Sequence, residues 1–141
     1  MGAWHLAMLA AAPFMVTGPK LRTWLALFVA GCAGFFVPAN WIVGYMLADL
    51  CAGAAVIRHP AGWQQKFIGA LFLMMVVFHV GYLFAMAESG DVNAHLYGES
   101  VRGIGWMQAA LLITWGLWDA VVVLANRYRD HRRGAVRTPA A

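Results

Sequence analysis

Two ionisable side chains, Asp49 and His79, interrupt stretches of sequence that are otherwise apolar. A carboxylate beside an imidazole can form a hydrogen bond or an ion pair, and the imidazole can bind and release a proton near neutral pH. A charged group at membrane depth costs at least about 2.5 kcal/mol, so it requires a partner, water or a function. We therefore expect these two residues either to act as a proton-sensitive switch or relay, or to hold two helices together by a polar bond.

The segment that carries His79 is the clearest membrane span in the sequence. Residues 67–87, between Lys66 and Glu88, include no Asp, Glu, Lys or Arg, and as a helix they reach about 31 Å, the thickness of a bilayer core. The composition agrees, because 62% of the residues are hydrophobic and 11% are charged, whereas soluble domains have roughly 45 to 50% and 25%. The expected fold is all-α, a polytopic transmembrane helical bundle.

Prolines, glycines and charged residues divide the apolar sequence into five expected spans. They cover about 3–18, 23–37, 41–57, 67–87 and 103–125, within a bundle of residues 1–126 that a basic cytoplasmic tail, 127–141, follows. The first segment is short and contains Pro13, so either it spans or it lies in the interface and four spans remain. Lys20 and Arg22 are expected in a short connection, and residues 88–100 in a hydrophilic loop.

The second and third segments are expected to form a tight helical hairpin, because Pro38 and Asn40 between two apolar runs are a turn signal. Small residues recur at every fourth position on both arms, which lets two helix backbones approach closely. These helix-packing candidates are Ala26, Ala30 and Gly34 on one arm and Gly44, Ala48 and Ala52 on the other.

The basic residues predict the orientation. With five spans, nine of the ten Lys and Arg residues fall on one side of the membrane and only Arg102 falls on the other. Cytoplasmic loops carry this excess, so the sequence predicts a multi-pass protein of the cell inner membrane with a cytoplasmic C-terminal tail. Trp115 and Trp118 lie away from the segment ends, and we expect them to pack deeply.

Depth can be counted along the predicted spans. Asp49 and His79 each lie eight residues from an outward end, so both sit about 12 Å below the outer boundary, and a bond between them is expected. Asp119 lies about 9 Å from the inner boundary, where it can reach the interface or meet an arginine of the tail. A polar path between the two depths would need further groups, for which Gln108, Thr114, Tyr45 and Tyr82 are the candidates.

No catalytic, metal or cofactor site is expected. The five histidines show no pair at helical spacing, and the Cys-x-x-Cys-His motif of covalent haem is missing. Glycine-rich phosphate loops and the common hydrolase motifs are also missing, which argues against an enzyme. The net charge of +4 lies mostly in short connections and the tail, so a basic cytoplasmic face explains it without nucleic acid. Glu88, Asp91, His95 and Glu99 are expected to keep their loop solvated.

Two classes of function remain. The first is a self-associating membrane conduit or permeabilising protein; in size, hydropathy and basic tail the chain is similar in format to phage holins, although five spans exceed that format. The second is an accessory or assembly subunit of a larger membrane complex. The expected partners are membrane lipid and either further copies of the chain or another membrane protein.

Overall fold

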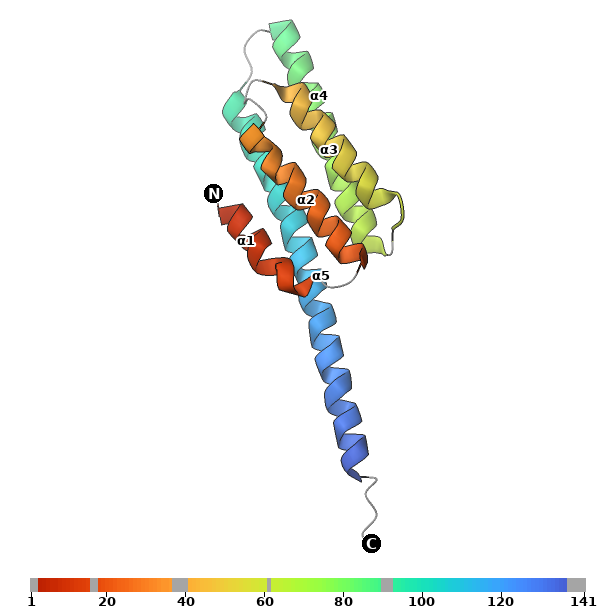
Figure 1. Cartoon of the computed structure of the whole chain (residues 1–141). Helices are drawn as coiled ribbons and strands as arrows, with labels where there is room; N and C mark the ends of the chain where they lie inside the picture. The colour runs from red at the N-terminus through yellow and green to blue at the C-terminus, as the bar shows by residue number, and fades with distance from the viewer. Residues whose placement is uncertain (1–2, 16–17, 37–40, 61, 90–92, 137–141) are drawn as a thin grey trace.

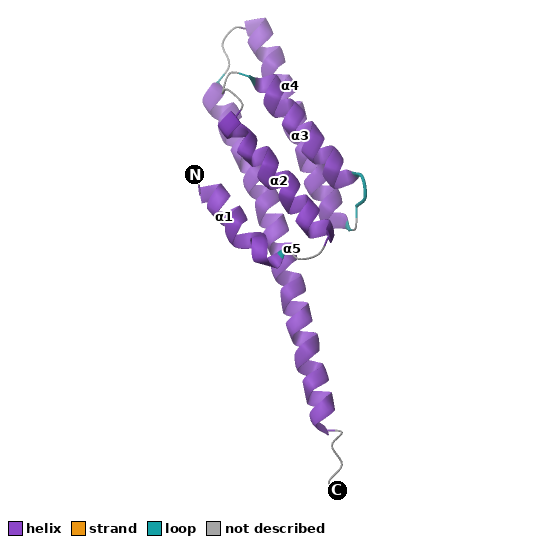
Figure 2. Cartoon of the chain, viewed as in Figure 1, coloured by secondary structure: helices purple, strands orange, loops and turns teal. Residues whose placement is uncertain are grey.

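The computed structural model describes residues 3–15, 18–36, 41–60, 62–89 and 93–136, and every regular element among them is helical. The elements are α1 (Ala3–Ala11), the 3₁₀ turn η1 (Ala12–Phe14), α2 (Gly18–Phe36), α3 (Ile42–Ile57), α4 (Trp63–Ser89) and α5 (Ala94–Val136), as Figures 1 and 2 show. The predicted all-α class is confirmed.

Local chemistry explains several helix ends. Pro13 cannot donate a backbone hydrogen bond, and α1 gives way there to η1. α3 ends just before Pro60, with the Arg58 N–H donating to the carbonyl of Ala54 at 3.0 Å. α5 begins after Asn93, whose side-chain oxygen accepts a hydrogen bond from the Leu96 N–H at 2.9 Å, an N-terminal cap.

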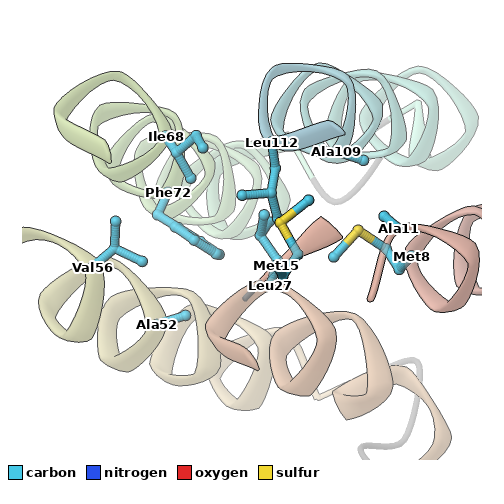
Figure 3. Packing of buried hydrophobic residues seen from close by; sticks show 10 residues of the cluster. All are labelled: Met8, Ala11, Met15, Leu27, Ala52, Val56, Ile68, Phe72, Ala109 and Leu112. Carbon is cyan, nitrogen blue, oxygen red and sulfur yellow. The ribbon is translucent and has the colours of Figure 1, made fainter. Parts of the chain in front are cut away.

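The helices lie side by side, and α5 runs past the others and projects from the bundle (Figure 1). α3 packs most extensively against α4 and next against α2, while α5 contacts α1, α2 and α4. Figure 3 shows apolar side chains from all five α-helices, and Met15 after η1, converging between the helices. The buried cluster contains Met8, Ala11, Met15, Leu27, Ala52, Val56, Ile68, Phe72, Ala109 and Leu112.

Glycines, rather than an alanine stripe, mark close described approaches of α3 and α4. A Cβ on Gly69 of α4 would overlap the Ile57 side chain, and a Cβ on Gly53 of α3 would lie 3.0 Å from the Cβ of Phe72. Four of the six small residues predicted to join α2 and α3 line a shared open groove of ≈860 Å³, namely Ala26, Ala30, Ala48 and Ala52. The turn predicted at residues 38–40 lies outside the described residues.

Two predicted boundaries are wrong in the same direction, because the helices continue through charged residues. Lys20 and Arg22 belong to the first turns of α2 and not to a connection. The hydrophilic loop predicted at 88–100 is largely helical, since α5 begins at Ala94. At the other end α5 continues through the first ten residues of the predicted tail, to Val136.

Within the described residues, two helices, α4 and α5, are long and apolar enough to cross a membrane. α3 and the segment Ala3–Phe14 are apolar but shorter, and the first turn of α2 is basic. The predicted five-span bundle is therefore not confirmed. α1 is part of the bundle, because Met8 and Ala11 are buried against its neighbours.

The contact at Gly53 generates a prediction about stability. Gly53→Leu should place a side chain where Phe72 already lies, and such overpacking costs about 1 to 3 kcal/mol. The matched control is Gly81→Leu on α4, because a Cβ at Gly81 meets nothing within 4 Å. Thermal unfolding in mild detergent should show a lower midpoint for the first variant and a nearly unchanged midpoint for the second. Equal midpoints for the two would contradict the described packing of α3 on α4.

Candidate functional site

The candidate site is a chain of three polar side chains from three helices, which we call the outer polar chain: Asp49 of α3, His79 of α4 and Tyr97 of α5. The His79 Nε2 lies 2.8 Å from the Asp49 Oδ2. On the other side of the ring, Nδ1 is hydrogen-bonded to the Tyr97 hydroxyl. Asp49 and His79 are only 6% and 2% exposed. The bond predicted from equal depth is thus present, and Tyr97 is an additional partner that the sequence reading missed.

The outer polar chain can hold the imidazole in two charge states. An ionised carboxylate only accepts hydrogen bonds, so the proton on Nε2 is donated to Asp49. In the neutral ring, Nδ1 accepts the hydrogen bond of the Tyr97 hydroxyl; in the protonated ring, Nδ1–H donates to the Tyr97 oxygen. Proton uptake therefore costs His79 neither partner, which is what a relay or a switch requires.

A cavity of ≈240 Å³ adjoins the outer polar chain. All five helices contribute to its wall, which is mainly apolar and includes the polar side chains of His5, Tyr45, Asp49, His79, Arg102 and Gln108. Arg102 is exposed and pairs with Glu99 at 2.6 Å, so one wall of the cavity reaches the surface of the bundle. At about 30 Å³ per molecule the cavity has the volume of about eight waters, and its few polar side chains are the places where water would be held.

A second polar cluster lies at the opposite end of the bundle. Lys20 of α2 is 3% exposed, forms an ion pair with Asp119 of α5 and lies over the Trp115 ring, 5.5 Å from its centroid. Asp119 was predicted to reach the interface or to meet an arginine of the tail; its described partner is Lys20 instead of an arginine. The pair is required physically, since a buried ammonium without a carboxylate would carry the full cost of desolvation.

Two buried side-chain amides, those of Gln65 and Gln108, join neighbouring helices. The Gln65 Nε2 donates to the Pro19 carbonyl at 2.9 Å and lies 2.8 Å from the Thr23 hydroxyl, which ties α4 to the start of α2. The Gln108 Nε2 lies 3.5 Å from the Ile68 carbonyl, so α5 meets α4 at middle height. Both amides are almost fully buried. Of these residues only Gln108 is predicted from the sequence, whereas Gln65 and Thr23 carry no signal that singles them out.

One face of α5 presents a polar group at three heights. Tyr97, Gln108 and Asp119 are eleven residues apart, which is close to three helical turns and about 16 Å of rise per step. Each of the three contacts another helix: Tyr97 contacts His79, Gln108 contacts the Ile68 carbonyl, and Asp119 contacts Lys20. The eleven-residue spacing was a signal in the sequence that could have placed Tyr97 with the other two.

The other residues singled out from the sequence lie in different surroundings, and only some of them lie near the outer polar chain. Thr114 is exposed and its hydroxyl bonds to carbonyls of its own helix, so it lies off any internal path. Tyr45 lines the cavity, and the Tyr82 ring lies 4.1 Å from that of Tyr97.

Trp118 is 69% exposed, so the prediction that it packs deeply is wrong, whereas Trp115 is partly buried. In the predicted loop Glu88, His95 and Glu99 are exposed, and Asp91 lies outside the described residues.

The outer polar chain generates a test by paired substitutions. His79→Leu should leave the buried Asp49 carboxylate without its imidazole partner, at a cost of about 1 to 3 kcal/mol. Removing both groups, in Asp49→Leu with His79→Leu, should restore part of that loss, because no buried charge then lacks a partner. Thermal unfolding in mild detergent measures His79→Leu, Asp49→Leu and the double variant, with Thr114→Val as the exposed control. If the double variant loses as much stability as the two single variants added together, the two side chains do not interact.

The chain was also compared with known proteins. No match was found among models of protein families, curated proteins or solved structures. The outer polar chain, the cavity and the polar face of α5 are therefore the observations from which a function has to be argued.

Proposed function

We propose that this chain is a multi-pass protein of the cell inner membrane, with its C-terminal end in the cytoplasm, and that it acts as a conduit for protons or small ions. The observation that carries the proposal is the set of buried polar groups at three heights inside a bundle whose outer surface is apolar. The outer polar chain is the proposed proton-binding station of this conduit.

The apolar surface supports the placement in a membrane. Only 33% of the most apolar window of α4, and 22% of that of α5, is buried within the chain. The core helix of a soluble protein would be mostly covered, because large apolar patches exposed to water drive association. Val77 and Phe84 of α4, each 67% exposed, are examples of side chains that lipid would cover.

We propose four full spans, of which α4 and α5 have the length and apolar character by themselves. α2 and α3 lie beside them (Figure 2) and would cross as parts of the same bundle, with the basic residues Lys66 and Arg58 at the cytoplasmic end. α1 and η1 together cover about 18 Å, less than the bilayer core, so we propose that they fill the bundle as a partial fifth segment.

The internal polar groups support conduction. Moving a proton through an apolar bundle requires groups that bind it and water between them. The outer polar chain provides an imidazole with a hydrogen-bond partner on each side, and the adjoining cavity has space for water. Gln108 lines the cavity and continues the polar face of α5 toward Asp119 and Lys20.

Proton flux into vesicles tests the proposal. The purified chain, reconstituted with a pH-sensitive dye inside and a potassium gradient with valinomycin as the driving force, should admit protons faster than empty vesicles. His79→Leu should slow this flux at least about tenfold, because the proton-binding group is removed. Thr114→Val, on the outside of α5, should retain the wild-type rate. A wild-type rate equal to that of empty vesicles, or an unchanged rate in His79→Leu, would reject the conduit.

A second candidate function is an accessory subunit, which the projecting end of α5 favours. Four apolar side chains at positions i, i+4, i+7 and i+11 form an exposed stripe there, from 45% to 65% exposed: Leu117, Val121, Leu124 and Tyr128. Such a stripe fits against another membrane helix, either of a second copy or of a different protein.

The size and composition of the particle extracted in mild detergent distinguish a second copy of this chain from a different protein as the partner. Extraction from the native membrane should give a particle larger than one chain, and Val121→Asn should reduce its size. Val77→Asn, at an equally exposed apolar position on α4, is the matched control and should leave the size unchanged. A particle built only from this chain supports self-association, a second polypeptide supports the accessory role, and a single chain would contradict both.

A further inference from the structure

The open groove of ≈860 Å³ between α2 and α3, which we call the α2/α3 groove, ends at a charged side chain. It follows α2 from Gly18 to Phe36, about 27 Å of helix rise, and these two helices lie side by side (Figure 1). On α3 its wall is made of small side chains, from Ala48 to Ala55. Of the described residues that line the groove, only Arg22, close to its lower end, carries a charge.

This lower end lies at the cytoplasmic boundary of the proposed membrane placement. The Arg22 Nη2 donates to the His59 carbonyl at 2.5 Å, so the first turns of α2 and the end of α3 are at one level. Arg58 precedes His59, and Lys66 stands in the first turn of α4, so basic residues mark this level on three neighbouring helices. Phospholipid headgroups occupy the same level in a bilayer.

The positive charge at this end is not neutralised. Lys20 pairs with Asp119, but Arg22 and Arg58 have no acidic side chain within ion-pair distance among the described residues. Arg58 follows Ala55 at i+3, which places it on the groove side of α3. The Nε of Arg22 is buried and has no hydrogen-bond acceptor in the described part of the chain. Because a guanidinium has five N–H donors in a planar fork that matches a phosphate, Arg22 retains donors for an anion.

We propose that the α2/α3 groove holds one anionic phospholipid of the cytoplasmic leaflet, with its phosphate at Arg22 and Arg58 and an acyl chain along the small residues of α3. Basic pockets between membrane helices on the cytoplasmic side bind such lipids. A second copy of this chain fits less well, because its described acidic side chain at this height is Asp119, which already pairs with Lys20. The proposal depends on the membrane placement above but not on conduction.

Lipid retention tests the charged end of the groove. The full-length chain, purified in mild detergent, is incubated with dioleoyl phosphatidylglycerol or dioleoyl phosphatidylcholine, and bound lipid is counted by native mass spectrometry. One phosphatidylglycerol should be retained in preference to phosphatidylcholine. Arg22→Gln and Arg58→Gln should each reduce its retention about fivefold, as expected for one basic side chain at the membrane surface. Lys66→Gln is the matched control, because it removes an equal charge at the same level but outside the groove, and it should retain the lipid.

A second pair of variants tests the apolar wall without a change of charge. Ala55→Trp fills the groove near Arg22 and should release the lipid. Ala54→Trp, at the adjacent exposed position of α3 that does not line the groove, should leave retention unchanged.

Several results would overturn the site. Equal losses in Arg22→Gln and Lys66→Gln would show diffuse attraction by the basic end of the bundle. Equal retention of the two lipids, unchanged retention in Ala55→Trp, or the same binding by glycerol phosphate alone would reject a lipid in the groove. A particle of two chains that Ala55→Trp separates would assign the groove to a second copy. Membrane extraction and proton flux are measured separately, so a failure of this site and a failure of the proposed function are distinguishable.

Discussion

One constraint shapes this molecule: a polar side chain inside an apolar helical bundle must find its partner within the protein. His79 meets the constraint with partners from two neighbouring helices, Asp49 on α3 and Tyr97 on α5. Lys20 meets it with Asp119. Apolar contacts fix the distance between two helices but tolerate sliding, whereas a hydrogen bond has a narrow range of length and angle. The polar contacts therefore set the relative heights of α2, α3, α4 and α5.

This constraint explains why part of the site was predictable. Asp49 and His79 lie on helices that follow one another in the sequence and run in opposite directions, so counting residues from the outer ends gives their depths. The count succeeded because the predicted ends were close to the real ones: α3 begins at Ile42 rather than 41, and α4 ends at Ser89 rather than 87. Both residues then have the same depth, and both need a partner.

The other partners could not be found in that way, because hydropathy ends a segment at its first charged residue and a helix does not. Backbone hydrogen bonding continues through polar residues until a proline or a cap intervenes, as Asn93 shows at the start of α5. Hydropathy thus places Tyr97 in a loop, although it lies one turn into a helix. It also places Lys20 in a connection, at a height that does not match that of Asp119, which is 99 residues away.

α5 contributes a polar side chain at each of the three levels, and its sequence determines where the helix can bend. The helix has no proline from Ala94 to Val136, so no backbone hydrogen bond is removed along its length. Gly98, Gly103 and Gly105 stand between Tyr97 and Gln108, while Gly116 alone stands between Gln108 and Asp119. Glycine lowers the stability of a helix interior, so α5 bends more easily between Tyr97 and Gln108 than between Gln108 and Asp119. Gly105 lines the cavity, and its carbonyl accepts a hydrogen bond from the Trp4 indole at 3.2 Å. A change of charge on His79 would accordingly be absorbed around the cavity, and the ion pair of Lys20 with Asp119 would keep its place.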